Sequence, residues 1–207
     1  MAAFTATDHA HMARALEIAA RGQYAARPNP MVGCVIVNNG EVVGEGWHER
    51  AGEPHAEINA LKAAGDFARG ATAYVSLEPC AHHGKTPPCS KALIDAGVIK
   101  VVAATLDPYA QVAGRGLAAL RAEGVATEVG LMSAAAECLN AGYLSRVTRT
   151  RPFVRTKVAA SIDGAIAMNS GESQWITGTD ARHDVQRLRA RSGAIMTGIG
   201  TVLADDP

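Results

Sequence analysis

Three side chains, His55, Cys80 and Cys89, most constrain what this chain can fold into. One imidazole and two thiolates make a three-ligand set for zinc, and a fourth position left open for water is typical of a catalytic zinc site. Glu57 lies two residues after His55 and is not needed as a ligand. A glutamate at this spacing, followed by a Pro-Cys pair, is the proton carrier of zinc deaminases. The fold is therefore expected to bring Glu57 and the three ligands together.

The spacing of the two cysteines is unusual. Eight residues separate them, whereas the common deaminase pattern has two. We expect His55 to open one helix, and Pro79 suits the first turn of another. Two helix N-termini meeting at one metal would favour thiolates through their dipoles. The alternative is a structural zinc, in which a histidine such as His82 or His83 closes the fourth position.

Composition and charge define the class of protein. Of 207 residues, 48% are hydrophobic and 19% charged, which is an ordinary globular balance. Twenty basic residues offset twenty acidic ones, so no general affinity for polyanions is expected. We find no secretory signal and no apolar run that suggests a membrane span. Four cysteines in such a chain indicate metal binding and buried thiols rather than disulfides, and a cytoplasmic location.

Hydrophobic periodicity and turn residues predict that helices and strands alternate over the first two thirds of the chain. This alternation indicates a sheet covered by helices on both faces. The expected helices span residues 8–21, 55–64, 92–96, 117–123 and 133–146, and the expected strands span 32–37, 42–47, 72–77, 98–104 and 125–129.

A basic stretch, residues 146–152, interrupts this pattern, and we place a domain boundary there, the simpler interpretation being an ordinary charged helix end. We expect one domain over residues 1–147 and the beginning of a second over residues 152–207. Because the second segment is short for a domain, we expect it to be incomplete. Its expected elements are strands at 153–159 and 194–197 and a helix at 180–191.

Five segments resemble a single family, the bifunctional riboflavin-biosynthesis deaminase–reductases, over about residues 12–207. The segments are Pro28-Asn29-Pro30, Val32-Gly33-Cys34-Val35-Ile36-Val37, Pro54-His55-Ala56-Glu57, Leu77-Glu78-Pro79-Cys80 and Lys85-Thr86-Pro87-Pro88-Cys89. The resemblance implies an α/β protein, with a cytidine-deaminase-like three-layer α/β/α domain followed by the start of a dihydrofolate-reductase-like α/β domain. It also implies that His55, Cys80 and Cys89 bind Zn²⁺ and that Glu57 is the proton donor.

The resemblance further implies a function in riboflavin biosynthesis. The family's first domain hydrolyses the amino group of 2,5-diamino-6-(5-phosphoribosylamino)pyrimidin-4-one, which gives 5-amino-6-(5-phosphoribosylamino)uracil. The long cysteine spacer is the family's own, and it places His82, Lys85 and Thr86 near the metal. We expect Lys85 and its neighbours to contact the ribose phosphate, and Asn29 to hold the ribose or base. The simpler interpretation of Lys85 is a solvated lysine in a loop, and that of Asn29 is a turn residue between two prolines.

The segments Lys157–Gly164 and Gly171–Thr177 resemble the start of the family's NADPH-dependent reductase domain, which reduces the ribosyl group to ribityl. Taken alone, Gly198-Ile199-Gly200 would be interpreted as a tight turn. Trp175 would be interpreted as a core residue, and Arg189 as part of a solvated helix face. The resemblance implies that Ala159, Trp175, Thr201 and Asp205 lie near the cofactor and Ser173 and Arg189 near the substrate. Because we expect an incomplete domain, we predict no reductase turnover.

Two departures from the family pattern bear on substrate contacts. Asp107-Pro108-Tyr109-Ala110 stands where the family has Asp-Pro-Asn-Pro, and Ala81 replaces a usual serine. Neither change affects the metal ligands. Because family members self-associate, a homo-oligomer is also expected.

Two other functions compete with this interpretation. A tRNA adenosine deaminase or a cytidine-type nucleotide deaminase shares the zinc set, but normally has the short cysteine spacer and, for RNA, a basic surface. A non-enzymatic zinc module would need a fourth protein ligand and no spare glutamate. The substitution Glu57→Ala separates the last case, because a structural module would keep its function and a deaminase would lose it.

Overall fold

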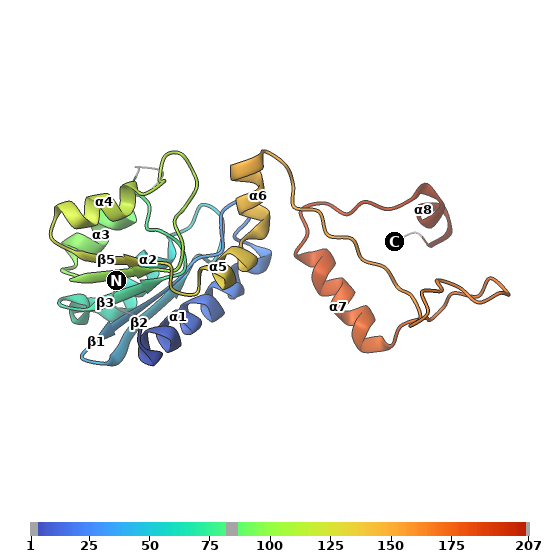
Figure 1. Ribbon diagram of the computed structural model, residues 1–207, viewed down its shortest axis with the longest axis horizontal. Coiled ribbons are helices and arrows are strands. Elements are labelled where there is room, and N and C mark those ends of the chain that lie inside the picture. The colour runs from blue at the N-terminus through green and yellow to red at the C-terminus, as the bar shows by residue number, and fades with distance from the viewer. Residues whose placement is uncertain (1–3, 82–86, 206–207) are drawn as a thin grey trace. The chain divides into compact units, whose positions relative to one another are not determined.

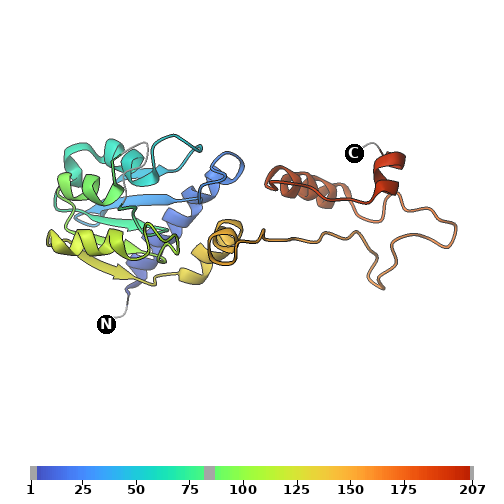
Figure 2. The same cartoon turned by 90° about the horizontal axis from the view of Figure 1, so that it is seen from above.

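The computed structural model describes residues 4–81 and 87–205, and the chain divides into two compact units, Met1–Phe153 and Val154–Pro207. The N-terminal unit is a sheet between helices, and the described part of the C-terminal unit contains helices and irregular chain but no strand (Figures 1 and 2). Each helix in the described parts of the chain is too short or too polar to span a membrane.

A mixed sheet of five strands forms the middle layer of the N-terminal unit, in the order β2-β1-β3-β4-β5. The strands are β1 (Gly33–Asn38), β2 (Glu41–Trp47), β3 (Thr72–Val75), β4 (Lys100–Ala103) and β5 (Ala126–Val129). Strand β1 pairs antiparallel with β2 and β3, whereas β3, β4 and β5 are parallel. Asn39 and Gly40 connect β1 to β2 with positive φ angles of 51° and 83°, as a two-residue hairpin turn requires.

Helices cover both faces of this sheet, which confirms the predicted three layers. The helices are α1 (Ala6–Ala19), α2 (Ala56–Ala64), α3 (Cys89–Asp95), α4 (Arg115–Ala122), α5 (Ser133–Leu139) and α6 (Ala141–Arg149), with 3-10 turns at Ala20–Tyr24 and Gly65–Ala68. Residues of α2, α3 and α4 pack in one core cluster, and residues of α1 and α5 pack in another on the opposite face.

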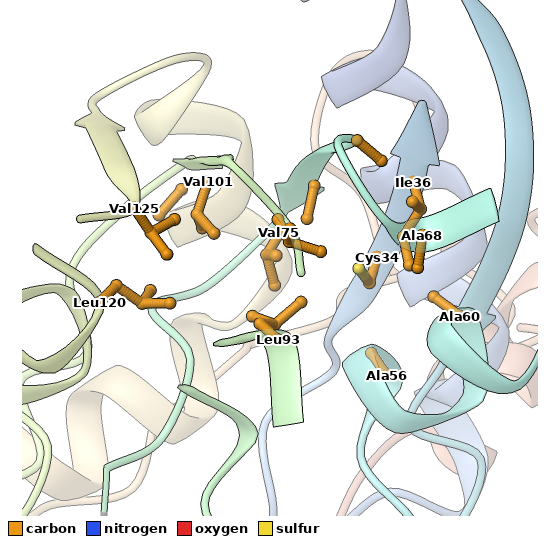
Figure 3. Packing of buried hydrophobic residues seen from close by; sticks show 14 of the residues in the cluster. Cys34, Ile36, Ala56, Ala60, Ala68, Val75, Leu93, Val101, Leu120 and Val125 are labelled. Atoms are coloured by element: carbon orange, nitrogen blue, oxygen red, sulfur yellow. The ribbon is translucent and has the colours of Figure 1, made fainter. Parts of the chain in front are cut away.

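The first of these clusters positions α2 against the sheet (Figure 3). Ala56 and Ala60 of α2 pack toward Cys34 and Ile36 of β1. A Cβ atom on Gly46 of β2 would lie 2.3 Å from the Ala60 nitrogen, so only glycine permits this close approach. Small residues on both elements therefore fix where α2 begins, and with it the positions of His55 and Glu57.

The predicted helix over residues 133–146 is wrong as a single element. It is broken at Asn140 into α5 and α6. The Asn140 side chain accepts a hydrogen bond from the Met31 N–H and donates one to the Met31 carbonyl, both at 2.8 Å. This pairing ties α6 to the loop before β1. The break depends on a residue 109 positions away, which local periodicity does not reveal.

The C-terminal unit confirms the predicted helix and contradicts the predicted strands. Helix α7 spans Thr179–Ala190, and α8 spans Ile199–Asp205. Neither 153–159 nor 194–197 forms a strand, and the side chains of Val154, Val158 and Met196 are 72%, 67% and 96% exposed. A strand is stabilised by pairing with a neighbour, and residues 154–205 show no such pairing.

All four cysteines are free. Cys34 and Cys89 are buried, whereas Cys138 is exposed on α5, contrary to the expectation of a buried thiol.

Candidate active site

His55, Cys80 and Cys89 lie together, and their ligand atoms all fall within 4.8 Å of one another. The His55 Nδ1 atom is 3.2 Å from the Cys89 sulfur and 3.6 Å from the Cys80 sulfur. Tetrahedral zinc with ordinary bond lengths separates a nitrogen and a sulfur ligand by about 3.6 Å. His55 caps α2 and Cys89 opens α3, so two helix N-termini meet here, although the second helix begins at Cys89 and not at Pro79, where it was expected. The three side chains fit a zinc ion.

The pKa values of the two cysteine thiols are shifted in opposite directions. A hydrogen bond from Cys89 is the largest of several causes that lower the pKa of Cys80 to about 4. The backbone N–H of Cys89 also donates to the Cys80 sulfur, at 3.3 Å. The same contact and burial raise the pKa of the Cys89 thiol. One thiolate is thus favoured at this position, and metal binding would require the second thiol to lose its proton as well.

Glu57 lies in the first turn of α2 and is only 3% exposed. Burial raises the pKa of its carboxyl group to about 7, while the charge of His55 acts in the opposite direction. A carboxyl group that titrates near neutral pH can both accept and release a proton during a reaction. Since Glu57 also lines the cavity that contains His55 and Cys80, it is well placed for proton transfer.

A buried histidine holds Asn29 in a defined orientation. The amide nitrogen of Asn29 lies 3.0 Å from His48 Nε2, and His48 Nδ1 lies 3.1 Å from the Pro54 carbonyl oxygen. Because the carbonyl can only accept, Nδ1 must carry the proton and Nε2 must accept from Asn29. Burial lowers the pKa of His48, which favours this neutral form. The Asn29 nitrogen is therefore committed to His48, and its amide oxygen is available to a ligand.

Glu78 holds the loop over residues 107–116 close to Cys80. Its buried carboxylate accepts backbone N–H bonds from Asp107, Gly114, Gly116 and Leu117 at 2.9–3.3 Å. These bonds occupy the N-terminus of α4, where a carboxylate is favoured. One residue after Glu78, the Pro79 carbonyl oxygen would lie 1.8 Å from a Cβ on Gly116. The loop over residues 107–116 is thus held against the segment that carries Cys80.

A cavity of ≈ 330 Å³ joins these features. Its walls come from residues 28–32, the start of α2, residues 77–80, residues 107–112 and α6. Tyr109, at the departure from the family pattern, lines this cavity. A cavity of this size suits a small molecule.

The remaining predicted site residues fall either outside the described residues or within the C-terminal unit. His82, Lys85 and Thr86 lie outside the described residues. Ala159, Ser173 and Trp175 lie on irregular chain, Arg189 on α7 and Thr201 on α8; Asp205 ends α8. The Trp175 ring is 69% exposed and lies 4.6 Å from the Arg182 guanidinium. The structure shows no hydrogen bond between any two of these C-terminal residues in the part of the chain that it describes.

Sequence reasoning missed several residues that shape the cavity. His48 follows a strand, Tyr143 and Arg146 lie on a helix, and Glu78 precedes the Pro-Cys pair. Glu78 belongs to one of the segments that resemble the family, but its residue type and position alone predict no role, and the other three lie in no chemical motif. A buried carboxyl or imidazole can be recognised only once its partners are known, and those of Glu78 are about 30–40 residues away.

Comparisons with known proteins agree with this arrangement. The cytidine and deoxycytidylate deaminase zinc-binding region matches residues 5–105, and the RibD C-terminal domain matches residues 152–207. The riboflavin biosynthesis protein RibD of Escherichia coli is 60% identical over 200 residues, which are 97% of this chain and 54% of that protein. The chain therefore spans about half the length of the curated relatives it matches.

Solved structures give the same result. Acinetobacter baumannii RibD, form 1, superposes with a TM-score of 0.90 at 53% identity, covering 97% of this chain and 56% of that one. A Thermotoga maritima structure, described as a diaminohydroxyphosphoribosylaminopyrimidine deaminase/5-amino-6-(5-phosphoribosylamino)uracil reductase, superposes with a TM-score of 0.91 at 41% identity, covering 97% and 58%. On its sequence, its fold and the domains it matches, the chain belongs to the RibD family of riboflavin-biosynthesis proteins.

Proposed function

We propose that the N-terminal unit hydrolyses the 2-amino group of 2,5-diamino-6-(5-phosphoribosylamino)pyrimidin-4-one, giving 5-amino-6-(5-phosphoribosylamino)uracil. One observation carries the proposal: three zinc-type ligands lie within 4.8 Å of one another, and two of them, His55 and Cys80, line a cavity together with Glu57, whose pKa is raised to about 7 by burial. The name of the Thermotoga maritima relative supports the choice of substrate.

In this proposal His55, Cys80 and Cys89 hold the zinc ion, and Glu57 transfers protons. Zinc, when bound, acts as a Lewis acid that lowers the pKa of water from 15.7 to about 7. Glu57 takes a proton from the attacking water as the new C–O bond forms at C2 of the ring, and delivers it to the adjacent ring nitrogen. It then moves the remaining hydroxyl proton to the amino group, the C–N bond breaks, and ammonia leaves a carbonyl behind.

The cavity residues would bind and orient the substrate. Because its amide nitrogen is committed to His48, Asn29 would offer its oxygen as an acceptor to the ribose or the base. Lys85, with His82 and Thr86, stays our prediction for contacts to the ribose phosphate. Tyr109, where the family has asparagine, would present an aromatic ring to the same cavity.

For residues 152–207 we propose the function of the family's reductase domain, the NADPH-dependent reduction of the ribosyl group by the whole protein. The match to the RibD C-terminal domain supports this assignment. Ala159, Trp175, Thr201 and Asp205 stay predicted cofactor contacts, and Ser173 and Arg189 predicted substrate contacts. Since residues 154–205 pair no strands, we predict no NADPH oxidation by this chain. A cytoplasmic location and a homo-oligomer also stay predictions.

The decisive experiment measures ammonia release from the diaminopyrimidine ribosyl phosphate by the zinc-loaded chain and by Glu57→Gln. We expect the glutamine variant to bind zinc and to lose about 10²–10⁴-fold in turnover, the usual contribution of a proton-transfer group. Zinc content and melting temperature serve as controls for folding. Equal turnover by both proteins would exclude Glu57 as the proton carrier. No release by a folded, zinc-loaded chain would count against this substrate, and single-stranded RNA and cytidine would be tested next.

A further inference from the structure

Arg146 is the only lysine or arginine among the described residues that line the cavity. It lies on α6, and the asparagine pairing with Met31 joins the beginning of this helix to the loop that carries Asn29. A cation therefore faces the same cavity as His55 and Cys80, two of the three predicted zinc ligands.

The guanidinium of Arg146 is held in place by uncharged groups. It donates one hydrogen bond to the Pro28 carbonyl, at 3.0 Å, and lies 5.6 Å from the centre of the Tyr143 ring. The Tyr143 hydroxyl in turn donates to Asp107, at 2.8 Å and 3.1 Å from its two carboxylate oxygens. These contacts orient the arginine without neutralising it.

The positive charge of Arg146 is available to a ligand. A guanidinium has five N–H donors, and the described residues form no salt bridge with it, in contrast to Arg14, which pairs with Glu17 and Glu45. Asp107, the acidic residue near it, already accepts hydrogen bonds from Tyr143 and from the Tyr109 N–H. A planar guanidinium with free donors suits a phosphate, which it can bind in a bidentate manner.

We propose that Arg146 binds the 5′-phosphate of the substrate at the deaminase cavity. This inference rests on the proposed function, because it assumes that the ligand is a pyrimidine ribosyl phosphate. It assigns Arg146 to binding and not to the chemical step. The phosphate would lie where α6 meets the Pro28-Asn29 loop. Because hydrogen bonds connect α6 to this loop, the same contacts would position both the phosphate and the part of the substrate that Asn29 holds.

The test compares Arg146→Gln with Arg149→Gln, both in the full chain. Arg149 lies on the same helix and donates to the Ser145 hydroxyl, and it does not line the cavity. Glutamine removes the charge and keeps an amide donor for the Pro28 carbonyl. The substrates are the phosphorylated diaminopyrimidine and the same compound after removal of its phosphate.

We expect Arg146→Gln to raise KM for the phosphorylated substrate roughly tenfold, as the loss of a hydrogen bond between charged groups does. We expect kcat to stay within about twofold and KM for the dephosphorylated compound to be unchanged. Arg149→Gln should behave like the unmodified chain. An equal rise in KM for both compounds would show that Arg146 only supports the loop, and no rise for either would overturn the inference.

A binding experiment separates this inference from the proposed function. Calorimetry with uridine 5′-monophosphate and with uridine requires no turnover. We expect Arg146→Gln to weaken the monophosphate roughly tenfold and to leave uridine binding unchanged. A chain that releases no ammonia and still shows this difference would contradict the proposed reaction and support the phosphate site. Equal effects on the binding of uridine 5′-monophosphate and of uridine would overturn the phosphate site even in an active deaminase.

Discussion

The two units of this chain contain similar kinds of residue and bury them very differently. In the N-terminal unit, Leu120 and Val101 are fully buried between helices and sheet. In the C-terminal unit, Ile162, Trp175 and Leu203 are 109%, 69% and 80% exposed, and α7 has no buried residue. Helices need only local hydrogen bonds, whereas strands need partners. The comparison shows why α7 and α8 form where the predicted strands do not.

Hydrogen exchange should give the largest contrast between the units. Amides of β1 are buried in paired strands, and residues 153–178 have no helix or strand. We expect β1 amides to exchange at least about 10³-fold more slowly, because their opening requires global unfolding. Exchange is followed by mass spectrometry of peptides from both units. Comparable protection in residues 153–178 would show that the C-terminal unit has a stable core of its own.

A pair of leucine substitutions tests the same contrast energetically. Leu120→Ala removes a fully buried side chain of α4, and Leu203→Ala removes an exposed one of α8. We expect a loss of about 2–5 kcal/mol in the free energy of unfolding for the first and a change within about 0.5 kcal/mol for the second. Urea titrations followed by circular dichroism measure both. A large loss in Leu203→Ala would mean that α8 is packed in solution.

Two helical glycines of the N-terminal unit, Gly116 and Gly142, differ in how closely other atoms surround them. A Cβ on Gly116 would lie 1.8 Å from the Pro79 carbonyl oxygen, whereas one on Gly142 would meet no atom within 4 Å. We expect Gly116→Ala to cost about 1–3 kcal/mol through overpacking and to reduce zinc affinity, because Cys80 is adjacent. Gly142→Ala should stabilise the chain by up to about 1 kcal/mol. Unchanged zinc affinity in Gly116→Ala would show that the loop over residues 107–116 shifts to accommodate the alanine without moving Cys80.

The smallest effect is expected at the start of α1. Asp8 forms a capping box with Thr5 and accepts a bond from the Tyr74 hydroxyl. Thr5 first, and then Tyr74, lower the pKa of its carboxyl from 3.8 to about 2. A lowered folded-state pKa stabilises the protein above pH 3.8, and this contribution is lost as the pH falls toward 2.

Asp8→Asn should therefore cost about 0.5–1 kcal/mol at pH 7, since the site is largely solvated. The difference from the unmodified chain should shrink as the pH approaches 2. Melting curves at several pH values measure it. A difference that persists unchanged at pH 2 would mean that packing, and not the charge of Asp8, stabilises this helix.

Much of the fold was predictable from local patterns. The helix after His55 and the alternation of helices and strands have short-range causes, and the structure confirms them. The errors have long-range causes. The helix break at Asn140 depends on Met31, and the missing strands depend on partners that residues 154–205 do not provide.

The same division applies to the site. The sequence by itself determined the candidate metal ligands and the candidate proton carrier Glu57, because their residue types and spacing carry a chemical meaning before any folding. Only the tertiary structure decided that His48 orients Asn29, that Glu78 anchors the loop beside Cys80, and that Arg146 faces the cavity. The physical reason is that these roles arise from burial and hydrogen bonds between distant segments. An imidazole, a carboxylate or a guanidinium has no defined role until its neighbours are in place.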